Sequence, residues 1–312
     1  MLLPLDSTML RRAAITVRDG ANAVFAGKKS EAVVSECGYG SDSAGNANGV
    51  AAAYARCVDA SVDWVIGPLG RSDVTALALA KLPVLRPTLM LSPLGTTPPQ
   101  PLAVLAPDLE SEADAIAQQA TEDACRKPLL AEASGALAGR ISVAISSYWR
   151  ERVATPLQQA SLGSRDSWRR TAEGWRRDNI DCILFAGGGA VLSELRPYLR
   201  GMVIYATSAS YEAALDRTVD WTGVRIADAP WLIETDRADF SPLAPAEALS
   251  PTLGRLFALG VDAARLVLVA GRDVLPSSFD GAIGKLALKD AQYRRQPMIG
   301  EFRERALVKV GP

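Results

Sequence analysis

The chain has 312 residues, of which 48% are hydrophobic, and its formal net charge is −1. At roughly 100–200 residues per domain, this length predicts two domains that each bury a core. The balanced charge offers no basic face for nucleic acid, and no run of about 18 apolar residues predicts a membrane-spanning helix. Histidine is absent, which excludes histidine-based triads and lowers the expectation of an enzyme.

Short apolar strands alternate with amphipathic helices in the first hundred residues. The pattern predicts strands over residues 2–5, 31–40, 62–70 and 83–91. Apolar side chains at helical spacing predict helices over residues 14–25, 50–58 and 72–82. Because strands that alternate with helices form parallel sheets with right-handed crossovers, we expect an open α/β domain here.

A proline-rich stretch interrupts the alternation. Residues 92–107 contain five prolines together with Gly95 and two threonines. Proline removes backbone donors and excludes a helix, so this stretch predicts an extended connection. We place the first crossing between the two domains near Pro107.

A second alternating set follows. We expect helices over residues 113–124, 141–157, 168–178 and 191–199, and strands over 127–134, 180–188, 202–208 and 224–236. A strong helix over 255–271 returns to the first domain, and short strands between Phe279 and Val310 cross back. The sequence therefore predicts one lobe from residues 1–106 and 235–280, and another from residues 107–234 and 281–312.

Polar residues follow the predicted strands of both lobes. In open parallel sheets, ligands meet the carboxyl ends of the strands, beside helix N-termini with free N–H groups. We therefore expect an interlobe ligand site lined by Ser7, Tyr39, Arg71, Ser72, Asp73, Ser92, Ser134, Ser208 and Tyr211. A carboxylate could bind at Ser72. The simpler alternative is that Ser72 only caps its helix, with Asp73 in the first turn, and the two roles are compatible.

Two patterns that suggest phosphate binding have simpler explanations. The segment 185–191 (FAGGGAV) is neither a dinucleotide fingerprint nor a P-loop, so we expect only a tight turn and no cofactor. Two arginine pairs alternate with tryptophans over 168–177 and could bind phosphates or stack on bases. Acidic neighbours favour a solvated amphipathic helix instead.

The four cysteines match no metal or redox spacing, and no metal site is expected. Cys125 ends a predicted helix and Cys182 starts a predicted strand, so a disulfide and buried free thiols are both open. Cys37 and Cys57 are expected at opposite ends of one helix and therefore unpaired.

Several segments resemble known proteins. VDWVIGPLG, SDVTALALA and PVLRPTLMLSPLG, within residues 62–95, resemble the strand–turn–helix–strand of type I periplasmic binding proteins, which bind amino acids and similar solutes. In order and spacing, four shorter segments are similar to the LppC/LpoA family: GPL at 67–69, DAPWLI at 228–233, RLFALGVDAARL at 255–266 and GAIGKLAL at 281–288. Members of that family are outer-membrane lipoproteins that activate class A penicillin-binding proteins.

The resemblance extends from Leu2 to about Val310 and implies a specific α/β fold. That fold has two Rossmann-like lobes joined by a hinge that the chain crosses several times. The resemblance also implies that the Ser72 hydroxyl holds a ligand carboxylate, with help from residues 92–96. Asp73 and Asp228 are weak candidates to receive an ammonium group. The sequence lacks the helical-repeat domain and the lipobox cysteine of LpoA-type proteins.

The sequence and the resemblance together predict a non-enzymatic binding module of the periplasm, anchored at the outer membrane by a lipid outside this chain. It would close on a small ligand, such as an amino acid or a muropeptide-like molecule, or present a surface to a class A penicillin-binding protein. The alternative is a solute receptor of an ABC transporter, which needs a buried carboxylate for an ammonium group. A Rossmann-like enzyme would need a phosphate loop and a clustered acid/base pair, which the sequence does not offer.

Overall fold

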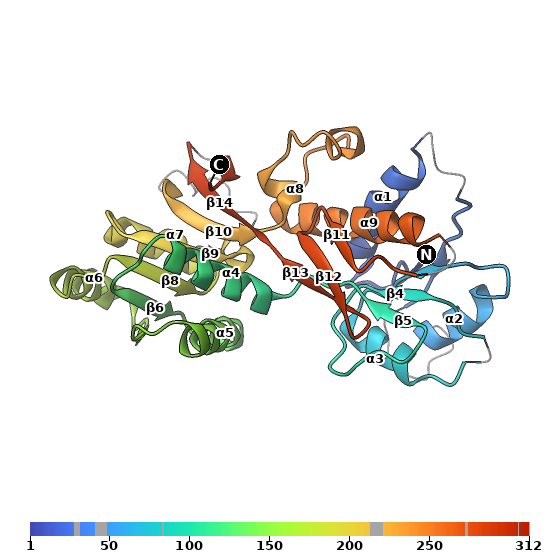
Figure 1. Cartoon of the computed structure of the whole chain (residues 1–312), viewed down its shortest axis with the longest axis horizontal. Helices are drawn as coiled ribbons and strands as arrows, with labels where there is room; N and C mark the ends of the chain where they lie inside the picture. Colours follow the sequence, from blue (N-terminus) through green and yellow to red (C-terminus); the bar gives the residue numbers. More distant parts are fainter. Residues whose placement is uncertain are drawn as a thin grey trace. The chain divides into compact units, whose positions relative to one another are not determined.

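A computed structural model describes residues 1–27, 32–40, 49–82, 84–212, 221–271, 274–304 and 306–311 (Figure 1). The chain divides into two compact units. Unit 1 contains Met1–Pro107 and Thr235–Arg295, and unit 2 contains Asp108–Glu234 and Gln296–Pro312. The chain therefore passes between the units after residues 107, 234 and 295.

The N-terminal part of unit 1 alternates strands and helices. In chain order these are β1 (Leu2–Leu3), α1 (Arg11–Phe25), β2 (Cys37–Gly38), α2 (Val50–Cys57), β3 (Val65–Ile66), α3 (Arg71–Leu79), β4 (Thr88–Met90) and β5 (Leu102–Val104). The pairs β1–β2, β3–β4 and β4–β5 are parallel. Strand β5 was not predicted, because it lies within the proline-rich stretch. It begins directly after Pro101, where backbone donors are available again, and its three side chains are buried.

The C-terminal part of unit 1 completes its larger sheet. After a short 3-10 turn (Ser241–Leu243) come α9 (Pro251–Ala270), β11 (Ser278–Asp280), β12 (Lys285–Lys289) and β13 (Gln292–Gln296). The strand order is β11-β12-β13-β5-β4-β3. Helix α9 packs closely on α1, since a Cβ atom added at Gly260 would lie 2.0 Å from the Val17 carbonyl oxygen. Only glycine permits this backbone approach.

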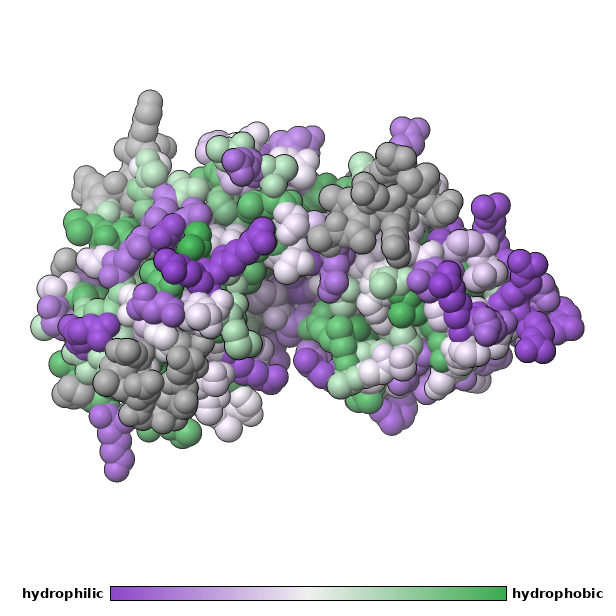
Figure 2. Space-filling view, turned by 180° about the vertical axis from the view of Figure 1, so that it is seen from behind, coloured by the Kyte–Doolittle hydropathy of each residue, from purple (hydrophilic) through white to green (hydrophobic). Residues whose placement is uncertain are grey.

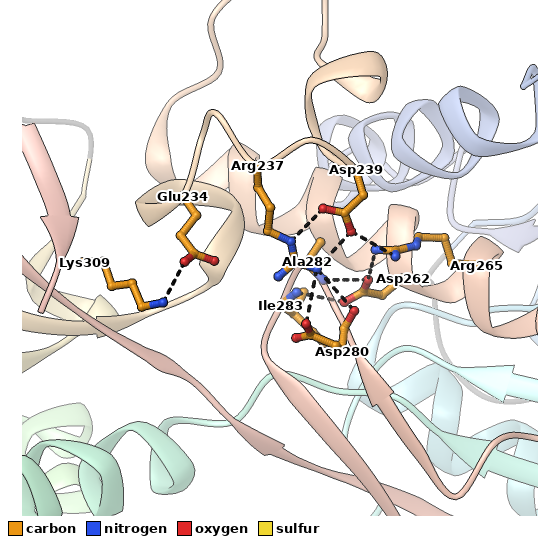
Figure 3. A network of polar contacts seen from close by, with 9 residues as sticks. All are labelled: Glu234, Arg237, Asp239, Asp262, Arg265, Asp280, Ala282, Ile283 and Lys309. Atoms are coloured by element: carbon orange, nitrogen blue, oxygen red, sulfur yellow. Dashed lines mark hydrogen bonds and ion pairs between the residues drawn. The ribbon is translucent and has the colours of Figure 1, made fainter. Parts of the chain in front are cut away.

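Residues 281–295 differ from the prediction, which placed them in the second lobe. They lie in unit 1 because β12 and β13 extend its sheet, with β13 parallel to β5. The Asp262 carboxylate on α9 also holds the turn before β12, accepting hydrogen bonds from the backbone N–H groups of Ala282 (2.7 Å) and Ile283 (2.8 Å; Figure 3). Glycine turns and short strands gave no sequence signal for which sheet they would join.

Unit 2 contains one mixed sheet between two layers of helices. Its elements are α4 (Leu109–Glu122), β6 (Pro128–Glu132), α5 (Ala136–Arg152), β7 (Gln158–Ser161), α6 (Trp168–Arg177), β8 (Cys182–Ala186), α7 (Gly189–Leu195), β9 (Val203–Thr207), β10 (Val224–Asp228), α8 (Pro230–Ile233), β14 (Met298–Arg303) and β15 (Ala306–Lys309). Among the residues of unit 2 that the structure describes, 3-10 turns span Arg165–Ser167, Arg196–Leu199 and Ser208–Ser210. The order is β15-β14-β10-β9-β8-β6-β7, with β14 antiparallel to β10 and β15 and the others parallel.

Successive residues of the central strands point to opposite faces of this sheet, as the pleat requires. On β8, Ile183 packs with the tryptophans of α6, whereas Leu184 packs with α4 and α5. Both faces are therefore buried, which explains the continuous apolar runs in these strands.

Two details of unit 2 were not predicted. Strand β7 was missed because its four residues are polar or small and mostly exposed. The strand expected over 224–236 stops at Asp228, since Pro230 starts the short helix α8. Proline is well suited to the first turn of a helix and poorly suited to a strand interior.

All four cysteines form disulfides, Cys37–Cys57 and Cys125–Cys182. The second pair is one of the two states that the sequence left open. The expectation that Cys37 and Cys57 are unpaired was wrong. Cys37 begins β2, and α2 runs back along the sheet and ends at Cys57, so their Cα atoms lie 6.2 Å apart.

Among the described residues, none of the helices combines the length and the apolarity needed to cross a bilayer.

Candidate functional site

The segments that follow the strands of unit 1 are joined by backbone hydrogen bonds. The Asp6 N–H donates to the Tyr39 carbonyl oxygen (3.2 Å), which links the segments after β1 and β2. The Leu91 N–H donates to the Pro68 carbonyl oxygen (2.9 Å), which links those after β3 and β4. The Ser92 hydroxyl donates to the Leu69 carbonyl oxygen. Each of these links joins two neighbouring segments that contain candidate residues of unit 1.

Tyr39 and Asp73 form a buried polar pair at this edge. The Tyr39 side chain is 1% exposed and Asp73 is 6% exposed, and the Tyr39 hydroxyl donates to Asp73 Oδ2 at 3.1 Å. Burial raises the pKa of Asp73, while hydrogen bonds from the Tyr39 and Ser72 hydroxyls offset part of that rise. Burial, and secondly the Asp73 carboxylate, raise the pKa of Tyr39 above its ordinary value. Tyr39 therefore keeps its proton and remains a donor.

The start of α3 differs from the prediction for Ser72. Gly70 is the N-cap residue and the helix begins at Arg71, so Ser72 lies inside the first turn rather than at the cap. A Cβ atom added at Gly70 would lie 2.2 Å from Asp73 Oδ2. The Asp73 side chain thus folds back over the helix N-terminus, where the positive end of the helix dipole favours an anion.

The Asp73 carboxylate therefore accepts a hydrogen bond from the Tyr39 hydroxyl at the edge where a ligand carboxylate was expected. The Ser72 side chain, the expected ligand donor, is exposed and precedes Asp73 in the first turn of α3. Sequence reasoning named Asp73 only as a weak partner for an ammonium group. Its position three residues after Gly70 was the available signal, because an acidic residue there can reach back to the helix start.

The remaining candidates of unit 1 have separate surroundings. Ser7 is buried, and its hydroxyl accepts a hydrogen bond from the Leu10 N–H (3.1 Å) in the turn before α1. Ser92 is half-buried, and Arg71 is exposed at the first position of α3. Arg71 and Ser72 are thus the two candidates of unit 1 with exposed side chains.

The candidates of unit 2 follow the parallel strands β6 and β9. Ser134 is exposed after β6. Ser208 is buried after β9, and its backbone N–H donates to Glu112 Oε2 of α4 at 2.8 Å. The half-buried Tyr211 ring meets Phe302 edge to face, with 5.2 Å between ring centroids. Ser134 is therefore the candidate of unit 2 that is most open to solvent.

Two buried carboxylates belong to the same edge of unit 2. Glu112 is 3% exposed and was not singled out, because the first turn of α4 contains two other acidic or capping residues that look alike in sequence. Asp228, a weak candidate for an ammonium partner, is fully buried and accepts a hydrogen bond from the Ala229 N–H (2.7 Å).

The triple-glycine turn serves close packing. A Cβ atom added at Gly189, the first residue of α7, would lie 2.2 Å from the Ser210 carbonyl oxygen. The glycine thus lets α7 approach the turn after β9, in agreement with the structural explanation of FAGGGAV.

Comparison with known proteins finds sequence similarity to one protein family and to one curated protein. Residues 160–299 match the family described as "LppC putative lipoprotein". Over 168 residues the chain is 25% identical to "Penicillin-binding protein activator LpoA" of Haemophilus influenzae. That alignment covers 51% of this chain and only 29% of the relative.

Two solved structures define the fold. A "putative branched-chain amino acid ABC transporter" from Chromobacterium violaceum has a TM-score of 0.81 and 28% identity, covering 96% of this chain and 98% of that one. The C-domain of Haemophilus influenzae LpoA has a TM-score of 0.75 and 20% identity, covering 99% of this chain and 98% of that one. The chain has the type I periplasmic-binding-protein fold, and its similarity to the LppC/LpoA family is confirmed. It covers 58% of a full-length LpoA structure.

Proposed function

We propose that this chain is a non-enzymatic binding module of the cell envelope that activates a penicillin-binding protein, as LpoA does. The match of residues 160–299 to the LppC family carries the proposal. The name of the curated relative describes a penicillin-binding protein activator, and the solved C-domain is described as a regulator of PBP1A. The full-length protein would then work in the periplasm as an outer-membrane lipoprotein.

The state of the carboxylates supports a binding role over a catalytic one. Asp73 accepts from the Tyr39 hydroxyl, Glu112 accepts from a backbone N–H, and Asp228 accepts from its neighbour's N–H. General acid/base work needs a carboxylate aimed at a substrate proton. These three groups are instead committed to donors within the protein, and no histidine is present to replace them.

A second candidate function is a solute receptor of an ABC transporter. The similarity to the Chromobacterium violaceum protein over almost the whole chain favours it. An amino-acid ligand would, however, have to displace the Asp73 carboxylate from the Tyr39 hydroxyl, and its own carboxylate would meet the negative charge of Asp73 at the start of α3. Like charges at one site repel, so this geometry favours the activator over the receptor.

The mechanism of either function would use the two units. A ligand or partner that touches both units stabilises one arrangement of them only through its higher affinity for that arrangement. We propose that the predicted interlobe site, including Arg71, Ser72 and Ser134, faces that ligand or partner.

The decisive experiment is reconstitution with a purified class A penicillin-binding protein. Glycan polymerisation and peptide cross-linking are measured with and without this chain, and a heat-unfolded sample of the same chain is the control. We expect the folded chain, but not the heat-unfolded sample, to raise the rates of glycan polymerisation and peptide cross-linking by the synthase. In parallel, a thermal-shift screen tests amino acids and muropeptide fragments, since a ligand at 100 times its Kd adds about 2.7 kcal/mol. Unchanged synthase rates together with a shift by an amino acid would establish the receptor function instead.

A further inference from the structure

Helix α6 in unit 2 presents an arginine-rich exposed face. Its ten residues, Trp168–Arg177, contain four arginines and one glutamate, which gives the helix a net charge of +3. Trp168, Ala172 and Trp175 form the buried side of the helix. The buried tryptophans are therefore not available to stack on bases, which removes base stacking as an explanation of this motif.

The arginines lie in two parallel rows. At about 100° per residue, Arg169 and Arg176 fall on one line along the helix, and Arg170 and Arg177 fall on a second. Residues seven apart are separated by about 10 Å along the axis. Glu173 lies between the rows, three or four residues from every arginine, so one carboxylate faces four guanidinium groups.

The residues that the structure describes leave most of this positive charge without a countercharge in contact. Arg176 donates a hydrogen bond to the Tyr198 carbonyl oxygen. The exposed Arg169, Arg170 and Arg177 make no ion pair or hydrogen bond with any residue that the structure describes. At the end of unit 2 where α6 lies, strongly hydrophilic side chains gather on the surface (Figure 2).

A shallow hollow adjoins the row formed by Arg169 and Arg176. It is lined by Arg169, Glu173, Arg176, Pro197 and Tyr198. Tyr198 is half-buried and Pro197 is exposed, so the hollow offers an apolar wall beside the guanidinium groups. Arginine and tyrosine together are enriched where proteins bind proteins.

We infer that this arginine face, formed by Arg169, Arg170, Arg176 and Arg177, binds an acidic segment of a protein partner. Guanidinium forks pair with carboxylates in a planar, bidentate manner. One carboxylate pair would face Arg169 and Arg170, and a second pair about 10 Å away would face Arg176 and Arg177. Three residues of extended chain span that distance. A lipid surface fits less well, because the apolar side of α6 is buried and cannot insert. The inference goes beyond the proposed function, since it holds for any acidic partner.

A direct binding assay tests it on the whole chain. The probe is a fluorescent peptide with two Glu-Glu pairs separated by one serine, and the matched peptide has glutamine in place of every glutamate. Fluorescence anisotropy is measured at low and at high salt. We expect the acidic peptide to bind and the glutamine peptide not to bind. The affinity of the acidic peptide should be lower at high salt, because salt screens the interaction between exposed charges.

Two variants with opposite expected effects separate binding from structure. Arg169→Gln/Arg170→Gln/Arg177→Gln removes three exposed charges and should weaken binding about 3- to 100-fold, at the strength of exposed ion pairs. Glu173→Gln removes the competing carboxylate and should tighten binding about two-fold. A matched control, Lys285→Gln/Lys289→Gln/Arg294→Gln, removes three exposed charges from unit 1 and should leave affinity unchanged.

Several results would overturn the inference. The inference fails if the two peptides bind with equal affinity, or if the arginine variant and the unit 1 control lose the same affinity for the acidic peptide. It also fails if the wild-type chain binds phosphatidylglycerol vesicles but not the acidic peptide. Displacement of the peptide by millimolar inorganic phosphate would reassign the face to a phosphate ligand. The assay contains no synthase, so its outcome is independent of the reconstitution result.

Discussion

Asp262 should make the stability of unit 1 depend on pH. Its side chain is fully buried on α9, where it accepts hydrogen bonds from the N–H groups of Ala282 and Ile283 (Figure 3). The Arg265 guanidinium lies 3.9 Å away. Burial outweighs these favourable contacts and raises the pKa of Asp262 from 3.8 to about 6.

The size and sign of the effect follow from this shift. A rise of about two pKa units corresponds to ~3 kcal/mol. Between pH 4 and 6 the folded protein holds a proton that the unfolded chain releases, so this group stabilises the fold most below pH 4. That contribution is lost as the pH rises through 6. Asp262→Asn cannot titrate, so the wild-type unfolding free energy should fall by ~3 kcal/mol relative to the variant between pH 4 and 7.

Guanidinium denaturation of both proteins across this pH range measures the difference. Amide hydrogen exchange at Ala282 and Ile283 reports whether the change is local to the turn that Asp262 holds. Asp280→Asn, which changes a nearby carboxylate with 65% of its side chain exposed, is the control. If the difference between wild type and Asp262→Asn stays constant with pH, the assignment of a buried, proton-binding carboxylate is refuted.

Three further changes test other parts of the fold, with chemical denaturation as the assay. Tyr39→Phe removes the donor to a buried carboxylate and should cost about 1–3 kcal/mol; an unchanged midpoint would mean that the hydrogen bond is absent. Gly260→Ala places a Cβ atom 2.0 Å from a backbone oxygen of α1, so we expect a loss of at least ~1–3 kcal/mol. Replacing Cys125 and Cys182 by alanine opens a loop with sequence separation 57 and should cost roughly 4 kcal/mol; equal stability of the variant and the oxidised wild type would contradict the pairing.

Local sequence patterns were sufficient for most of the elements and for the fold class. Helix α9 is apolar on most of its surface and has Ser250 as its N-cap, so its existence follows from the sequence alone. The strands β6, β8 and β9 are short apolar runs between turns, as buried parallel strands should be. These signals depend on neighbours within a few residues and need no knowledge of the tertiary structure.

The candidate site was predicted less completely. The sequence indicated which residues follow the strands, because the carboxyl ends of parallel strands share one edge. It did not indicate that the Asp73 side chain turns back over Gly70 and accepts a hydrogen bond from the Tyr39 hydroxyl. That arrangement depends on the packing of two segments that are more than 30 residues apart in the chain, the one after β2 and the start of α3.

The sequence by itself determined the alternation of strands and helices, and the resemblance of its segments identified the type I periplasmic-binding-protein fold. Only the tertiary structure decided that residues 281–295 join the sheet of unit 1, that Cys37 reaches Cys57, and that β5 forms among prolines. The physical reason is common to all three. Strand pairing and disulfide formation join residues far apart in the chain, and their free energy depends on burial that no local pattern records.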